Sequence, residues 1–217
     1  MATYVILRSI PDFLWAALET LKIAVFSAFL SLVLGIILAA LYQSRIKIFM
    51  LLISVYANLI RSTPLLVQLY FLYYGLPFLG IHVDKYPATV FAFTVNTGAY
   101  VVEILRGGLE GIDQGQFNAA YSLGMTWTGC LSFIIFPQVL RRVISPLLTQ
   151  MAYLIKDTSL AAVLVIAEVT YTYKRIAAET YRSFEALVLP VIIYFSLYVI
   201  FRAASSAFQK DRSIIRG

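Results

Sequence analysis

Residues 13–41 read FLWAALETLKIAVFSAFLSLVLGIILAAL, an apolar run with only two charged side chains. A helix that crosses a bilayer needs about 20 consecutive apolar residues, and this run is long enough. It is also too long for the apolar core of a signal peptide, which has roughly 7 to 15 residues. We therefore expect a transmembrane helix that the protein retains.

Four further apolar runs follow, at about residues 48–79, 88–105, 143–171 and 187–208. The chain of 217 residues is 61% hydrophobic and 13% charged, whereas a soluble domain has roughly 45–50% and 25%. This composition excludes an ordinary soluble globule and leaves no length for a separate soluble catalytic domain. We expect an all-α membrane protein with about five transmembrane helices, which form a single domain over residues 1–217.

The positively charged residues lie between the apolar runs and indicate how the chain is oriented. Seventeen Lys and Arg against eleven Asp and Glu give a net charge of +6. Nine of these Lys and Arg fall on one side of the predicted membrane and five on the other, and short cytoplasmic loops hold the excess. We therefore predict the amino terminus outside, the carboxyl terminus inside and the glycine-rich segment 107–142 in the cytoplasm. We expect no nucleic acid partner, because no solvated basic face remains for one.

The residue inventory argues against a metal site and against ATP hydrolysis by this chain. One cysteine, Cys130, and one histidine, His82, allow no intrachain disulfide and no Cys/His set for zinc. A phosphate-binding Walker loop needs a lysine followed by Ser or Thr, and none of the six lysines has that neighbour. We expect no metal and no nucleotide-hydrolysing activity here.

The segment 107–142 contains the signals of a short helix of its own. Asp113 followed three residues later by Gln116 resembles a capping box, and Gly124 is a plausible left-handed terminator. Phe117, Ala120, Tyr121 and Gly124 recur at helical spacing, so they share one face. That face either packs against the membrane helices and the lipid surface, or docks a cytoplasmic partner.

A longer spacing pattern covers the same segment. Asn118-Ala119-Ala120 is followed after three residues by Gly124, and after nine more by Ile134, Phe136 and Pro137. This pattern resembles the cytoplasmic signature of permease subunits of ATP-binding-cassette importers in the polar amino acid uptake branch. That signature runs Glu-Ala-Ala, three residues, Gly, nine residues, Ile, one residue, Leu-Pro. Asn118 stands here for the usual Glu, and Phe136 stands for the usual Leu.

The resemblance extends over roughly residues 15–205. Residues 61–68, RSTPLLVQ, are similar to the family's Arg-Gly-Thr-Pro-Leu-Leu-Val-Gln segment, and residues 156–160, KDTSL, also agree. Residues 73–77, YYGLP, resemble permeases for cystine and related amino acids. The chain is therefore similar to permeases of the cystine, arginine, glutamine and histidine type.

This resemblance implies an architecture and a set of partners. It implies the fold of a type I importer permease with a cytoplasmic coupling helix, placed in a bacterial cytoplasmic (inner) membrane. It further implies a dimer with a second permease copy or paralogue, two cytoplasmic ATPases that bind ATP and magnesium, and an extracytoplasmic substrate-binding protein. The substrate implied is a polar amino acid, and no cofactor is implied in this chain.

Polar side chains interrupt the second, third and fourth apolar runs. An ionisable group inside a span costs at least about 2.5 to 3.5 kcal/mol, so it normally faces a cavity or a partner. In the second run Thr63 directly precedes a proline, whose missing amide breaks helical hydrogen bonding. In the third, Asn96, Tyr100 and Glu103 fall at i, i+4 and i+7 and share one helix face. In the fourth, Asp157 lies near the middle of the run.

These five residues are the candidates for the substrate path or binding site. Asn96 and Glu103 can hold the ammonium and polar groups of an amino acid, and Tyr100 offers a flat apolar wall. Two alternatives stay open. The stripe on the third span can form a polar seam between helices or subunits. Asp157 and Lys156, which point about 100° apart on a helix, can each pair with a charged group of a neighbouring helix.

The cytoplasmic segment supplies the candidates for coupling to an ATPase. They are Gly115, Phe117, Asn118, Ala119, Ala120, Gly124 and Pro137. Two rival functions remain: an ion-gradient-driven secondary transporter or channel with Glu103 and Asp157 as ion sites, and a membrane scaffold that conducts nothing. The first rival leaves the long glycine-rich segment without a purpose.

Overall fold

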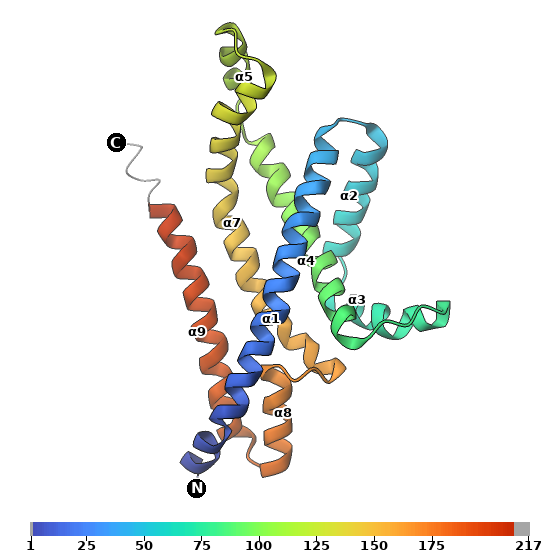
Figure 1. Ribbon diagram of the computed structural model, residues 1–217, viewed down its shortest axis with the longest axis vertical. Coiled ribbons are helices and arrows are strands. Elements are labelled where there is room, and N and C mark those ends of the chain that lie inside the picture. The colour runs from blue at the N-terminus through green and yellow to red at the C-terminus, as the bar shows by residue number, and fades with distance from the viewer. Residues whose placement is uncertain (1, 211–217) are drawn as a thin grey trace.

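The computed structural model describes the backbone of residues 2–210 and the side chains of residues 7–203, and it is built from helices (Figure 1). The longer helices are α1 (Ala2–Gln43), α2 (Lys47–Arg61), α4 (Lys85–Glu110), α7 (Phe136–Asp157), α8 (Val169–Thr180) and α9 (Ser183–Lys210). The shorter helices are α3 (Leu65–Tyr70), η1 (Phe71–Gly75), η2 (Leu76–Leu79), α5 (Gln114–Ser122), α6 (Trp127–Gly129), η3 (Cys130–Ile135) and η4 (Thr158–Leu164).

Four helical segments are long and apolar enough to cross a membrane: Leu7–Gln43, Lys85–Glu110, Trp127–Leu164 and Ser183–Ala203. A fifth candidate is a bent pair, in which Lys47–Arg61 and Leu65–Leu79 meet at 104°. The expected all-α membrane fold is therefore confirmed, with four spans or five when the bent pair is counted.

The boundaries of the fourth predicted span were wrong. The sequence favoured residues 143–171, whereas the helical span is Trp127–Leu164. Arg141 and Arg142 are exposed on the first turns of α7, while Val139 and Val143 beside them are buried, so the segment is an amphipathic helix rather than a loop. The non-helical part of segment 107–142 is correspondingly short, because α4 also continues through two glycines to Glu110.

The tightest packing joins α1 and α4 along a line of small residues. A side chain at Gly35 of α1 would collide with Val101 of α4, and one at Gly98 would come within 2.8 Å of Leu34 Cδ2. Small residues allow membrane helices to approach closely, because lipid supplies no hydrophobic force between them. The main buried core, which includes Ile23, Phe93 and Val101, lies along this contact.

Two adjacent glycines on α4 provide a matched test of this packing. A Cβ at Gly108 would collide with Val143 Cγ1 of α7, and the branched Val143 has little rotamer freedom in a helix. A Cβ at Gly107 meets nothing within 4 Å. We expect Gly108→Ala to destabilise the permease by about 1–3 kcal/mol, and Gly107→Ala to stabilise it by up to about 1 kcal/mol. Thermal unfolding of the purified variants in detergent measures both, and equal melting temperatures would contradict the packing.

The end of the molecule at α8 is held by a buried carboxylate. Glu168 is fully buried and accepts hydrogen bonds from the backbone amides of Thr170 at 2.9 Å and Tyr171 at 2.8 Å, which caps α8. The Tyr194 hydroxyl of α9 donates to the same carboxylate at 2.7 Å. These bonds fix α8 against α9 and so hold the chain that leaves η4.

Candidate functional site

The break between α2 and α3 forms one wall of the site. Pro64 has no N–H, so it cannot donate to the Ile60 carbonyl as the fourth residue along a helix would. Helix α2 ends at Arg61, and α3 resumes at Leu65 after the 104° bend. In a membrane such a freed carbonyl needs another donor, and the Gln68 side-chain amide supplies one at 2.7 Å from Ile60 O.

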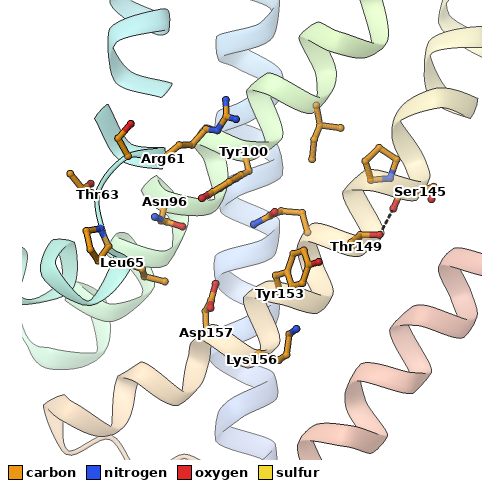
Figure 2. Close-up of a pocket in the computed structure, with 15 residues that line it drawn as sticks. Arg61, Thr63, Leu65, Asn96, Tyr100, Ser145, Thr149, Tyr153, Lys156 and Asp157 are labelled. Atoms are coloured by element: carbon orange, nitrogen blue, oxygen red, sulfur yellow. Dashed lines mark hydrogen bonds between the residues drawn. The ribbon is translucent and has the colours of Figure 1, made fainter. Parts of the chain in front are cut away.

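A cavity of about 1170 Å³ opens between this break, α4 and α7 (Figure 2). Its lining residues come from three parts of the chain that are distant in sequence. They are Arg61, Ser62, Thr63, Pro64 and Leu65 from the break, Asn96, Tyr100 and Ile104 from α4, and Ser145, Pro146, Thr149, Gln150, Tyr153, Lys156 and Asp157 from α7.

The cavity wall carries charges of both signs. The Lys156 ammonium lies over the rings of Tyr153 at 4.4 Å and Tyr198 at 4.9 Å. The Arg61 guanidinium lies over the Tyr100 ring, 5.5 Å from its centre. Among the side chains of residues 7–203, neither Lys156 nor Asp157 has an oppositely charged group within ion-pair distance. Figure 2 shows Asp157 and Arg61 on different sides of the same cavity.

Four of the five residues predicted for the path come together in this cavity, namely Thr63, Asn96, Tyr100 and Asp157. Glu103 does not line it. Its two carboxylate oxygens are paired with Arg61 at 3.2 Å and with Arg106 at 2.6 Å. Glu103 therefore joins α2 to α4 through an ion pair, which is the structural alternative left open by the sequence.

Helix α7 contributes cavity side chains that were not among the candidates from the sequence, among them Ser145, Thr149 and Tyr153. Ser145, Thr149, Tyr153 and Lys156 recur at i, i+4, i+8 and i+11 and face the cavity from one side of the helix. Thr149 donates to the Ser145 carbonyl at 3.0 Å, as the dashed line in Figure 2 shows. The same stripe test that identified α4 would have found them, because all of them lie within the predicted fourth run.

Helix α5 projects at the end of the molecule beyond the hairpin between α1 and α2 (Figure 1). Asp113 caps it by accepting from the Gly115 amide at 2.6 Å, and Gly124 follows it with a left-handed φ of 75°. Both predicted end signals are therefore confirmed. Gln116 does not complete a capping box, because its side-chain oxygen accepts from Gln138 at 3.3 Å instead.

The apolar face predicted for this helix is divided between the protein and the solvent. Ala120 is 1% exposed and packs with Phe117 against a core that includes Ile135. Tyr121 and Leu123 are exposed, Leu123 by 80%. The residues of this face therefore differ in burial, because η3 folds back and covers Ala120.

The other predicted coupling residues are accessible from the same end. Gly115, Asn118, Ala119 and Gly124 are exposed, and Pro137 at the start of α7 is partly buried. The structure therefore brings an exposed polar and apolar surface together around α5, with Leu123 at its tip.

Apolar helices long enough to span a bilayer, arranged around a charged cavity with a capped helix beyond one end, define a polytopic membrane permease. Residues 31–213 match the family model described as binding-protein-dependent transport system inner membrane component. The match covers most of the chain, so the chain belongs to this family.

Similar proteins agree with this assignment. The chain is 36% identical to a probable glutamine ABC transporter permease of Bacillus subtilis strain 168, over 85% of this chain and 87% of that protein. It is 33% identical to an arginine transport system permease of the same strain, over 93% and 92% of the two chains. It also resembles a chain in the crystal structure of an amino acid ABC transporter with histidines, with a TM-score of 0.89, 33% identity and coverage of 94% and 96%.

Family membership confirms the predicted resemblance, fold class and general function. The chain is the multi-pass inner membrane permease component of an ATP-binding-cassette importer and belongs to a transporter complex with an ATPase. It is not itself the ATPase, and permease subunits of this kind carry no cofactor, because the partner ATPase binds ATP.

Proposed function

We propose that this permease forms the translocation path for a polar amino acid and that the cavity between α2, α4 and α7 is its binding place. An amino acid carries a carboxylate and an ammonium close together. The observation that carries the proposal is that charges of both signs, Lys156 and Asp157, stand on the wall of one cavity and form no ion pair with any side chain of residues 7–203. Arg61 adds a second cation, and Thr63 and Asn96 add hydrogen-bonding groups.

Transport requires two states of the cavity, one open to each side, and a motor that shifts the equilibrium between them. We assign the contact with the ATPase to the exposed surface around α5. A second permease copy or a paralogue completes the membrane unit, and an extracytoplasmic binding protein delivers the amino acid. The whole of residues 1–217 acts as one transmembrane domain in this scheme.

The proposed orientation places α5 in the cytoplasm, the amino terminus outside and the carboxyl terminus inside. The hairpin between α1 and α2 lies at the same end as α5 (Figure 1) and carries Arg45 and Lys47. Arg141 and Arg142 lie close to α5 at the start of α7. Such an excess of Lys and Arg is typical of the cytoplasmic side.

Reconstitution with the partner ATPase tests the proposed function. We expect proteoliposomes that contain both proteins and a supply of binding protein to accumulate a labelled polar amino acid only when ATP reaches the ATPase. Uptake driven by an ion gradient without the ATPase would instead support a secondary transporter. An assembled complex that hydrolyses ATP and moves none of a panel of amino acids would support a scaffold.

A further inference from the structure

Two side chains bond across the break between α2 and α3: Thr63, whose hydroxyl lies 3.0 Å from Leu59 O and 3.2 Å from Ile60 O, and Gln68, which reaches back from α3. The Gln68 amide nitrogen lies 2.7 Å from Ile60 O, 3.1 Å from Thr63 O and 2.7 Å from Thr63 Oγ1. Its two hydrogens thus serve the Ile60 carbonyl, which Pro64 cannot reach and which the backbone amide and hydroxyl of Thr63 approach only at 3.4 and 3.2 Å, and the Thr63 backbone at the bend itself. Gln68 belongs to α3 and bonds to residues that precede Pro64, so its side chain ties the two sides of the bend together.

A second contact fixes which way round the Gln68 amide points. Asn96 of α4 donates from Nδ2 to Gln68 Oε1 at 3.0 Å. Ile60 O and Thr63 O are carbonyls and can only accept, so the nitrogen of Gln68 must face them and its oxygen must face Asn96. Asn96 is 5% exposed, so little solvent competes for this bond.

The bond network therefore connects the end of α2, the break and α4. Arg61 and Thr63, on the break itself, line the cavity, and their direction depends on the angle at which α3 leaves α2. Loss of the Gln68 amide would take this donor from Thr63 O and the shortest donor from Ile60 O, which would favour a change in the bend angle or a water molecule in the gap. Both would move Arg61 and Thr63 relative to α4 and α7.

We propose that Gln68 is a positioning residue: it sets the bend between α2 and α3 and thereby the shape of the cavity wall. The proposal rests on the proposed translocation path, since it states what holds that path in its substrate-binding form. Gln68 itself is absent from the lining of the cavity, so it acts through Arg61 and Thr63 and not by touching the substrate.

In the variant Gln68→Glu, the hydrogen-bond donor at position 68 is present or absent according to the pH. The ionised carboxylate has no donor for Ile60 O and Thr63 O, whereas the protonated acid has one O–H to donate and keeps an oxygen for Asn96. Gln68→Ala has no donor at any pH. We therefore expect the Glu variant to recover the wild-type bend on acidification and the Ala variant to fail to recover it.

The bend is measured as a distance between two spin labels in the assembled transporter in lipid nanodiscs. Cysteines replace Lys47 at the start of α2 and Phe78, which is 91% exposed on η2, while the native Cys130 is buried and stays unlabelled. We expect Gln68→Glu to show a broad or shifted distance at about pH 8 and the wild-type distance at about pH 5. Gln43→Glu, an exposed change at the end of α1, should keep the wild-type distance at both.

Uptake kinetics provide the second readout. We expect the KM of Gln68→Glu to rise about tenfold at high pH and to return toward the wild-type value at low pH, as the loss of a buried hydrogen bond predicts. The wild-type profile, measured at the same pH values, accounts for every pH dependence that does not come from residue 68.

The two readouts separate the two proposals. If both Gln68 variants keep the wild-type spin-label distance at every pH, Gln68 does not set the bend and the inference is overturned. If the distances change as expected while the wild-type complex moves no amino acid, the positioning role stands and the proposed function fails.

Discussion

Replacing Asp157 with Asn should lower amino acid uptake by about 100-fold and leave the assembled transporter intact. The Asp157 carboxylate lines the cavity, and no cation among the described side chains neutralises it. The ammonium of an amino acid can therefore become its ion-pair partner. Asn keeps the shape of the side chain and removes the charge, so the variant tests the charge alone. ATP-dependent uptake into proteoliposomes is the measurement, and co-purification of the ATPase confirms assembly.

Asp84→Asn is the matched control for this prediction. Asp84 is exposed, precedes α4 and makes no side-chain capping bond, so the same chemical change there should leave uptake at the wild-type level. Normal uptake by Asp157→Asn would remove this carboxylate from the path. Loss of the complex itself would make Asp157 a structural residue, the alternative that the sequence left open.

The number and type of the spans followed from the sequence because burial in lipid depends on composition. Each run of about 20 apolar residues satisfies its backbone hydrogen bonds only as a helix, so its secondary structure follows from its own sequence. The ends of α5 could also be predicted from nearby residues, since the Asp113 cap and the Gly124 terminator act within one helical turn.

The partners of charged groups could not be predicted in this way. Glu103 meets Arg61 because α2 packs against α4 and ends beside it. The two residues are far apart in the sequence, and nothing in either neighbourhood fixes how the two helices pack. The sequence therefore placed Glu103 correctly on the polar face of α4 but could not distinguish a substrate ligand from an ion pair.

Which residues of α5 are buried also depends on an element that is distant in the sequence. Helical spacing groups Phe117, Ala120 and Tyr121 correctly, yet only the path of η3 decides which of them is covered. Arg141 and Arg142 of α7 led to the wrong start of the fourth span. Exposed charges on an amphipathic helix resemble those of a loop when the surface that the helix packs against is unknown. Patterning identifies a face, and tertiary structure decides what it meets.

The variant Leu123→Asp, at the exposed end of α5, should lose the ATPase from the complex. Leu123 ends the projecting helix α5 (Figure 1) and is 80% exposed, so this large apolar side chain packs little against the described part of its own chain. An apolar anchor at an interface is commonly worth 2 kcal/mol or more, and a buried carboxylate there adds a desolvation penalty. We expect binding of the ATPase to weaken by about 30-fold or more, as measured by co-purification and by ATP-dependent uptake.

Two companion variants separate docking from folding. Leu123→Met keeps an apolar side chain of similar volume and should retain the ATPase. Ala120→Asp places a charge at a position that is 1% exposed, so it should lower the melting temperature of the permease even without the ATPase. Leu123→Asp should leave that melting temperature unchanged, because an exposed side chain contributes little to the fold. Full retention of the ATPase by Leu123→Asp would show that the ATPase binds another surface of the permease, and the exposed leucine would then need a different partner.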